Sequence, residues 1–153
     1  MVLGYYYGEG TRAKFGIGAI LTGIYDSEND RFVSLAKIGT GFKDEDWAHI
    51  KATLEPLKIE KLPENMIIEK TLMPDVLVTP KIVVVIEADS ISRSKIHGVS
   101  TKAKKADTKP IEGLSLRFPR IKVFGRDKSP QDATTVAEMQ RMFALQETED
   151  ASA

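Results

Sequence analysis

The segment Gly113-Leu-Ser-Leu-Arg-Phe-Pro-Arg-Ile-Lys-Val-Phe-Gly-Arg-Asp-Lys128 combines a strand pattern with a concentration of basic side chains. Apolar and polar residues alternate from Leu114 to Phe118, as in a strand with one buried face, until Pro119 interrupts the hydrogen-bonded ladder. We therefore expect an edge strand or a strand end here. Arginines beside an aromatic ring suit phosphate contacts combined with stacking or wedging against bases. An ordinary core position for Phe118 is the alternative.

The basic character extends beyond this segment. From Arg93 to Lys128, eleven Lys and Arg residues stand against three acidic ones, a net charge of +8 in a chain whose formal net charge is zero. The residues before this block include ten Lys and Arg and fourteen Asp and Glu, and the residues after it include one Arg and five Asp and Glu, so each flank has a net charge of −4. Such segregation is expected of a face that binds a polyanion. A solvated lysine-rich loop is the alternative, and Ser100–Pro110, which contains nothing to bury, is expected to be a mobile basic loop.

The composition is that of one soluble globular domain. The chain has 153 residues, of which 42% are hydrophobic and 29% charged, enough for an independent core. The absence of cysteine excludes a disulfide framework, a Cys-based zinc site and a thiol nucleophile. No metal site is expected, because His49 and His97 are far apart and have no Cys partners. No apolar stretch approaches the roughly 20 residues of a membrane helix, so we expect an intracellular protein without a membrane partner, and a monomer.

Five main strands are expected, at residues 2–7, 15–25, 31–38, 81–92 and 113–124, with 81–92 at the centre of the sheet and a short strand at 75–78. An internal amphipathic helix is expected at 44–57, where Trp47, Ile50 and Leu54 share one face. A C-terminal helix is expected at 136–146, preceded by a Thr135/Glu138 capping box. This pattern predicts an all-β fold with added helices, an OB-fold with a five-stranded Greek-key barrel over residues 1–147, followed by an acidic, disordered tail at 148–153.

A family resemblance extends over most of the chain. Leu116-Arg-Phe-Pro-Arg120, followed by Arg126-Asp-Lys-Ser-Pro-Gln-Asp-Ala-Thr-Thr135, resembles the C-terminal signature of ATP-dependent DNA ligases. Further segments resemble the same family in the same order: Leu3–Ala13, Ala36–Phe42 with Asp44-Glu45, Pro74–Val76 and Val85–Ser94. The resemblance spans about residues 3 to 146 and identifies the chain with the OB-fold domain at the end of such enzymes.

The resemblance implies two sets of site residues. Arg117 and Phe118 are similar to the pair that enters the minor groove beside a nick, Arg120 is expected to contact phosphate, and Arg12 and Lys14 are further candidates for the DNA backbone. The second set matches the terminal motif of the family, whose basic groups approach the β- and γ-phosphates of ATP during adenylylation: Arg126, Asp127 and Lys128. The family usually has an arginine two residues before the Asp. Gly125 holds that place here, so either the strand shifts locally, or Lys122 or Arg126 substitutes.

The chemistry of ligation also needs residues that this sequence does not contain. There is no Lys-x-Asp-Gly motif, and without its nucleophilic lysine covalent catalysis of the ligase type cannot start. We therefore expect a fragment without catalytic residues, inactive alone, whose parent enzyme uses ATP and Mg²⁺ in DNA repair, replication or recombination. No cofactor is expected to be bound to the isolated domain. Its expected partners are nicked double-stranded DNA and the adenylylation domain of the same ligase.

Three alternatives remain open. A free-standing OB-fold binder of single-stranded nucleic acid needs exposed aromatic side chains along a groove, for which Tyr5, Tyr6 and Tyr7 are the candidates. The OB domain of an RNA-capping or RNA-ligating nucleotidyltransferase shares the fold and part of the terminal motif. An interaction module without a nucleic-acid role leaves the basic segment unexplained.

Overall fold

The computed structural model describes residues 1–93 and 114–152, so the predicted loop at Ser100–Pro110 and His97 lie outside the described residues. The described part contains ten strands: β1 Val2–Tyr6, β2 Ala19–Asp26, β3 Arg31–Ile38, β4 Lys58–Ile59, β5 Met66–Ile67, β6 Val76–Val78, β7 Val83–Glu87, β8 Ser90–Arg93, β9 Leu114–Arg117 and β10 Arg120–Arg126. It also contains two α-helices and four 3₁₀ helices: α1 Asp44–Leu54, α2 Val136–Ser152, η1 Gly10–Phe15, η2 Glu55–Leu57, η3 Lys70–Leu72 and η4 Pro130–Asp132. The fold is thus mostly sheet with two helices.

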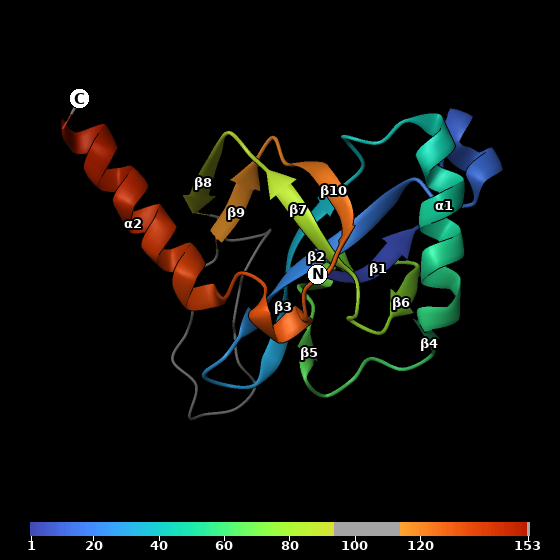
Figure 1. Cartoon of the computed structure of the whole chain (residues 1–153), viewed down its shortest axis with the longest axis horizontal. Helices are drawn as coiled ribbons and strands as arrows, with labels where there is room; N and C mark the ends of the chain where they lie inside the picture. The colour runs from blue at the N-terminus through green and yellow to red at the C-terminus, as the bar shows by residue number, and fades with distance from the viewer. Residues whose placement is uncertain (94–113, 153) are drawn as a thin grey trace.

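A curled sheet forms the body of the molecule (Figure 1). Its strand order is β4-β6-β1-β2-β3-β5, and all neighbours are antiparallel except β3 and β5. β1, β2 and β3 follow one another as neighbours, and a turn at residues 27–30 joins β2 to β3. All five residues of β1 are buried, because other elements cover both of its faces. The predicted strand at 31–38 is confirmed at both ends.

Two predicted long strands are each broken in the structure. The expected strand at 81–92 divides into β7 and β8, and the expected strand at 113–124 divides into β9 and β10. β7 pairs with β10, and β8 pairs with β9, in separate two-stranded sheets. The prediction that 81–92 lies at the centre of the sheet is therefore wrong. The strand end predicted at Pro119 is confirmed, because β9 stops at Arg117. Pro119, two residues further on, has no N–H to donate to a ladder.

The first turn of the chain also differs from the prediction. Residues 10–15 form η1, so the expected strand at 15–25 starts only at Ala19 and ends at Asp26. Gly16 ends η1 with φ of 70°, a left-handed conformation that stops both helix and strand. The structure therefore has short extra elements where alternation alone indicated one continuous strand.

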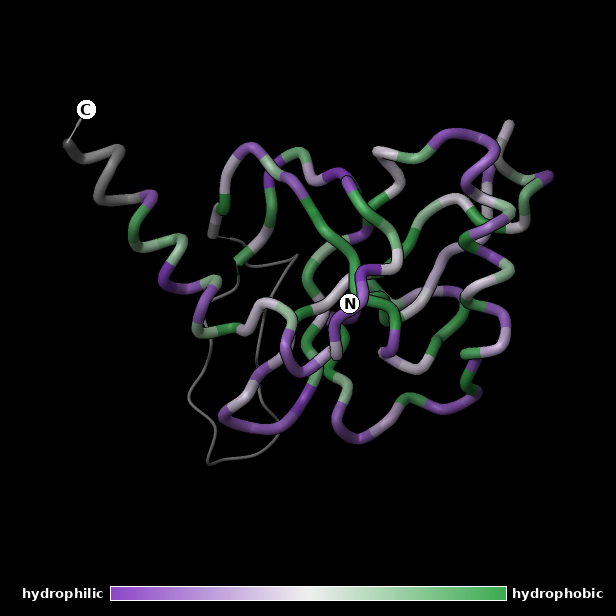
Figure 2. The backbone as a smooth tube through the Cα atoms, in the orientation of Figure 1, coloured by the Kyte–Doolittle hydropathy of each residue, from purple (hydrophilic) through white to green (hydrophobic). Residues whose placement is uncertain are grey.

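α1 packs on the sheet through the predicted apolar face. Trp47, Ile50 and Leu54 are buried in one cluster together with Ile121 of β10. Because Ile121 belongs to the strand that follows the Arg-Phe-Pro-Arg segment, this cluster connects the helix to the predicted contact region. Figure 2 shows the corresponding apolar stretches of the trace concentrated in the middle of the molecule.

α2 projects from the opposite side of the molecule (Figure 1). It begins at the predicted Val136, and the backbone N–H of Glu138 donates to Thr135 Oγ1 at 3.2 Å, which is half of the predicted capping box. The helix extends to Ser152, so it covers most of the segment predicted to be a disordered tail, where Glu and Ala have high helix propensity. No helix in the described part of the chain is both long and apolar enough to cross a membrane.

Candidate nucleic-acid interface

Phe118 stands at a sharp corner between two strands. β9 ends at Arg117 and β10 begins at Arg120, so only Phe118 and Pro119 connect them. The backbone of Phe118 has φ of 51°, and its side chain is 65% exposed. The left-handed conformation costs a non-glycine residue about 1–2 kcal/mol. The alternative of an ordinary core position is therefore wrong, and a strained, exposed aromatic is a candidate ligand contact.

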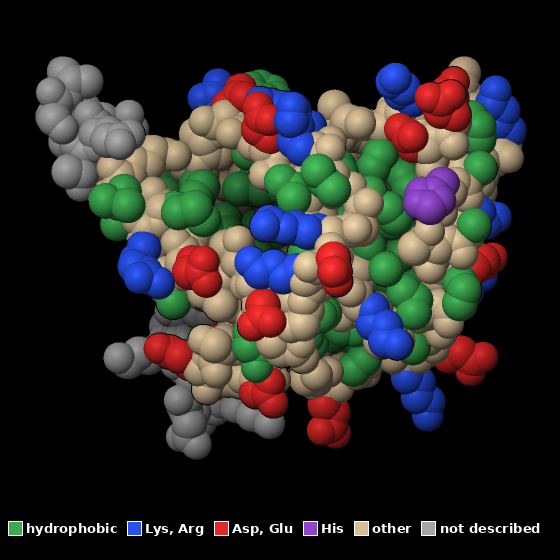
Figure 3. All heavy atoms as spheres, viewed as in Figure 1, with side chains coloured by type: hydrophobic (Ala, Val, Ile, Leu, Met, Phe, Trp, Pro, Cys, Tyr) green, Lys and Arg blue, Asp and Glu red, His purple; other side chains and the backbone are tan. Residues whose placement is uncertain are grey.

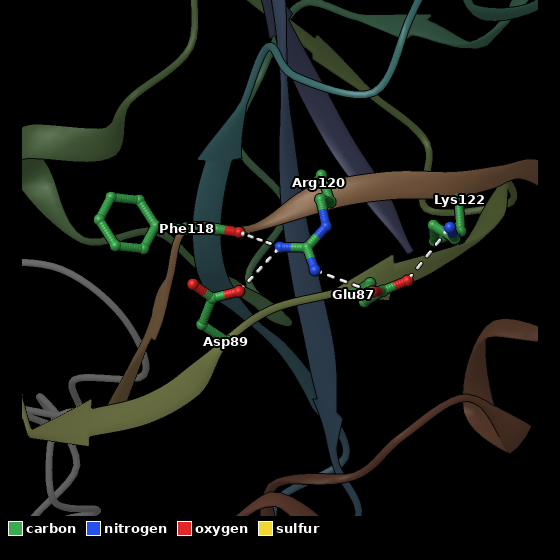
Figure 4. Close-up of polar contacts among 5 residues, drawn as sticks. All are labelled: Glu87, Asp89, Phe118, Arg120 and Lys122. Carbon is green, nitrogen blue, oxygen red and sulfur yellow. Dashed lines mark hydrogen bonds and ion pairs between the residues drawn. The ribbon is translucent and has the colours of Figure 1, made fainter.

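The guanidinium of Arg120 ties this corner to the end of β7 (Figure 4). Its Nη2 donates to Glu87 Oε1 at 2.8 Å, and its Nη1 donates to Asp89 Oδ1 at 3.1 Å and to the backbone oxygen of Phe118 at 3.0 Å. The backbone N–H of Asp89 also donates to the carbonyl of Arg117 at 2.9 Å. These bonds hold the backbone on both sides of Phe118, while its ring points away from the ionic group.

The same glutamate holds a second basic side chain. Lys122 Nζ lies 3.2 Å from Glu87 Oε2, so the two oxygens of Glu87 serve two cations. Hydrogen bonds from Arg120, and then from Lys122, lower the pKa of the Glu87 carboxyl. By contrast, Arg117 has no carboxylate partner among the described residues, and its guanidinium carbon lies 5.4 Å from the centre of the Phe118 ring. Within the described part of the chain, Arg117 is therefore the basic side chain at the corner that no carboxylate holds.

The acidic partners are functional candidates that sequence reasoning missed. Glu87 and Asp89 alternate at the end of an apolar run, which indicates one polar side of a strand end. Nothing in that pattern says which basic residues they face, because Arg120 lies 33 and 31 positions further along the chain. Their pairing with β10 became visible only in the fold.

The two remaining predicted DNA contacts lie on η1. In Figure 1, η1 and the β9–β10 corner both lie along the upper edge of the molecule, with α1 next to η1. Lys14 is exposed, and its Nζ lies 5.0 Å from the centre of the Phe15 ring. The backbone of Arg12 belongs to η1, but its side chain lies outside what the structure describes. In this view, η1 and the β9–β10 corner therefore share one edge of the molecule.

The second predicted set lies at the other end of β10. This strand has seven residues, so at about 3.3 Å per residue its ends are roughly 20 Å apart. Arg126, Asp127 and Lys128 are exposed at the far end, where Arg126 borders a cavity of about 210 Å³ next to β7 and α2. Lys122 is not with them, because it faces Glu87 near the corner. The structure thus separates Lys122 from the other three members of the predicted set.

Gly125 accounts for the unusual spacing in this motif. It has φ of 83°, and the pairing of β10 with β7 changes register between Phe124 and Arg126. Glycine tolerates this conformation, and such a bulge re-aims the side chains that follow it. The strand therefore has an irregularity at Gly125, and which residue takes the place of the arginine expected there stays a prediction.

The charged surface is mixed rather than uniformly basic. Figure 3 shows basic and acidic side chains side by side at the upper edge of the face, and further basic side chains near its centre, bordered by apolar surface. Among the three consecutive tyrosines, Tyr5 is 1% and Tyr6 8% exposed, whereas Tyr7 is 59% exposed. A groove lined by all three rings is therefore absent from the described part of the chain.

Comparison with known proteins gives a consistent relationship. The family model described as the C-terminal region of ATP-dependent DNA ligase matches residues 13–128. The chain is 49% identical over 150 residues to a probable DNA ligase of Dictyoglomus thermophilum, covering 97% of this chain and 24% of that protein. It is 36% identical over 141 residues to DNA ligase 1 of Methanosarcina barkeri, covering 92% of this chain and 24% of that protein. The chain thus spans about a quarter of the length of these curated relatives.

Solved structures show a similar fold. The ligase domain of M. tuberculosis LigD superimposes with a TM-score of 0.58 at 21% identity, covering 87% of this chain and 36% of that one. A mycobacterial DNA ligase D complexed with ATP and MES gives a TM-score of 0.52, also at 21% identity, covering 88% of this chain and 36% of that one. At this level of identity the likeness concerns the fold alone.

Proposed function

The chain belongs to the family of C-terminal regions of ATP-dependent DNA ligases, and from this premise we propose that it binds nicked duplex DNA through the β9–β10 corner. Phe118 acts as an apolar wedge in the minor groove beside the nick, and Arg117 contacts a neighbouring phosphate. Lys14 and Arg12 extend the contact along the backbone of the duplex. The observation that carries the proposal is the exposed, left-handed Phe118 beside Arg117, which no carboxylate of the described residues holds.

The physical argument rests on what each group gains from DNA. A phenyl ring left 65% exposed gains free energy when it stacks on or wedges between bases, and each such contact contributes about 1–3 kcal/mol. A nick removes one backbone connection and so makes unstacking at that step easier. The hydrogen bonds on both sides of Phe118 hold its backbone in place before DNA arrives, which lowers the entropy lost on binding.

We also propose that the curled sheet is the barrel of an OB-fold. The antiparallel β1-β2-β3 meander and the β7–β10 pair, with α1 packed at one end, support this assignment. In this interpretation residues 1–147 form one domain, and the wedge lies on a connection between strands rather than on a strand face.

A second role, toward ATP, is proposed for the far end of β10. Arg126 and Lys128 are exposed and have no carboxylate partner among the described residues, so they suit the β- and γ-phosphates of ATP when the rest of the enzyme is adenylylated. Asp127 lies between them, and Lys122 is reassigned to the DNA group because it lies beside Glu87. The described residues contain no group of three or more His, Asp or Glu that could hold a metal ion. We therefore assign the Mg²⁺ that accompanies ATP to the rest of the parent enzyme.

The isolated chain is proposed to bind DNA without sealing it. The relatives are about four times longer, and adenylylation is assigned to the part of them that this chain does not span. Binding by this part alone is expected to be weak, because it lacks the contacts that the neighbouring domains contribute. The burial of Tyr5 and Tyr6 argues against a single-strand binder with an aromatic groove.

The test is a set of fluorescence-anisotropy titrations of the whole chain with nicked duplex, intact duplex and single-stranded DNA at 50 and 200 mM salt. We expect the tightest binding to nicked duplex, and affinities that fall with salt by a slope of about 0.9 per phosphate contact. A nicked RNA duplex, measured in parallel, is expected to bind more weakly. Tighter binding to single strands than to nicked duplex would instead support a binder of single-stranded nucleic acid. Tighter binding to the nicked RNA duplex would support the domain of an RNA-capping or RNA-ligating nucleotidyltransferase.

A further inference from the structure

Two negative charges lie inside the surface that we assign to DNA. The side chains of Glu87 and Asp89 are 48% and 54% exposed, and both lie beside the corner that presents Phe118 (Figure 4). Carboxylates at such a position repel phosphates. Exposed ion pairs contribute little to the free energy of folding, so the stability of the domain does not explain why these carboxylates are there.

The carboxylates occupy the cations that would otherwise bind phosphate. Glu87 accepts from Arg120 with one oxygen, at 2.8 Å, and faces Lys122 with the other, at 3.2 Å. Asp89 lies 3.1 Å from the second terminal nitrogen of Arg120. Arg120 and Lys122 are therefore neutralised in the free chain, whereas Arg117 is not paired with any carboxylate in the described part of the chain.

We infer that Glu87 and Asp89 are specificity-determining residues, which withhold Arg120 and Lys122 from undistorted DNA and release them at a nick. The inference rests on the proposed function. A phosphate that approaches Arg120 must displace a carboxylate already bonded to it, so the exchange brings little net gain. On an intact duplex Phe118 does not enter, and the cations stay with their carboxylates. At a nick the inserted ring draws the backbone close enough for phosphates to replace them. The two carboxylates thus compete with phosphates for Arg120 and Lys122, and this competition disfavours binding to the undistorted duplex.

The salt dependence of binding distinguishes this role from a structural one. Each cation that contacts a phosphate adds about 0.9 to the slope of log affinity against log salt. In the unmodified chain we expect a steeper slope for nicked than for intact duplex. Glu87→Gln releases Arg120 from its strongest partner and Lys122 from its carboxylate. We expect it to steepen the slope for intact duplex by about one to two and to leave the slope for nicked duplex unchanged. The preference for nicked over intact duplex then falls about 3- to 10-fold at 50 mM salt.

Two further variants make the test specific. Glu60→Gln removes the same charge from an exposed carboxylate that forms no ion pair in the described part of the chain, so it reports the effect of net charge alone. Asp89→Asn weakens the hold on Arg120 only and is expected to steepen the intact-duplex slope by about one. Urea unfolding of each variant checks that the domain remains folded.

The possible results separate the inference from the function on which it rests. If the unmodified chain prefers nicked duplex but Glu87→Gln and Asp89→Asn bind intact duplex with the same slope as Glu60→Gln, the inference is overturned and the proposed function stands. If the unmodified chain shows no preference for nicked duplex, both are overturned. A slope that steepens for intact duplex alone supports both.

Discussion

Replacing Phe118 with alanine is expected to weaken binding to nicked duplex about 10-fold while changing binding to intact duplex by less than about 2-fold. The lost wedge or stacking contact corresponds to about 1–3 kcal/mol, and 1.4 kcal/mol is tenfold in affinity. The folded state is not expected to suffer, because the ring is 65% exposed. Anisotropy titrations with the two duplexes, at one salt concentration, measure the difference.

Matched variants identify what the ring contributes. Val123→Ala removes an exposed apolar side chain from β10 and is expected to bind both duplexes like the unmodified chain. Phe118→Leu keeps an apolar wedge without an aromatic face, so partial retention of nick binding indicates wedging and complete loss indicates stacking. An equal loss on nicked and intact duplex for Phe118→Ala would contradict a role at the nick.

Replacing Gly41 with alanine is expected to lower the free energy of unfolding by about 3 kcal/mol. Gly41 has φ of 104°, and an added Cβ would lie 2.3 Å from the backbone oxygen of Ile121, which cannot move aside as a flexible side chain can. Strain of about 1–2 kcal/mol adds to an overpacking cost of about 1–3 kcal/mol. The loop also accepts a hydrogen bond from Ile121, whose N–H lies 3.0 Å from the oxygen of Thr40. The substitution therefore acts on β10 beside Arg120.

Gly125 provides the control for this substitution. It also has positive φ, but an added Cβ would meet nothing within 4 Å. Gly125→Ala should therefore cost only the backbone strain, about 1 kcal/mol. Urea unfolding followed by fluorescence of Trp47 measures both, and an m-value of about 2 kcal/mol/M converts the expected Gly41→Ala loss into a midpoint lowered by about 1.5 M. Similar midpoints for the two variants would show that the close approach to Ile121 is not limiting.

Local sequence patterns predicted the existence of one helix and one strand well. The buried face of the helix, with Trp47, Ile50 and Leu54, was predicted correctly because its periodicity reports which side is covered, but α1 ends at Leu54 and not at residue 57. The bounds of the strand at 31–38 were also predicted correctly, although its first five residues are all buried, which an alternating pattern does not indicate. The breaks in the expected strands at 81–92 and 113–124 were harder to predict from the sequence. Pro119 signals the second break through its missing N–H, but the first occurs at residues 88–89, without glycine or proline.

The sequence indicated which residues to consider at the candidate site, but not how they are arranged. The Arg-Phe-Pro-Arg segment indicated Phe118 and its basic neighbours, yet the positive φ of Phe118 has no signature in the sequence. The family resemblance grouped Lys122 with Arg126, Asp127 and Lys128, as one candidate to replace the arginine expected before Asp127. An extended strand separates them, and its partner strand supplies Glu87 to Lys122. Pairing between strands far apart in sequence therefore decided which charges are free.

Photo-crosslinking from position 118 tests the central proposal most directly. The chain carrying p-benzoylphenylalanine in place of Phe118 is irradiated with nicked or intact duplex, and the crosslinked nucleotides are mapped. A second chain with the same group in place of the exposed Leu62 is the control. We predict crosslinks from position 118 to the nucleotides on either side of the nick, few with intact duplex, and no such focus from position 62. Crosslinks from position 118 spread evenly along both duplexes, or no more frequent than from position 62, would contradict the account.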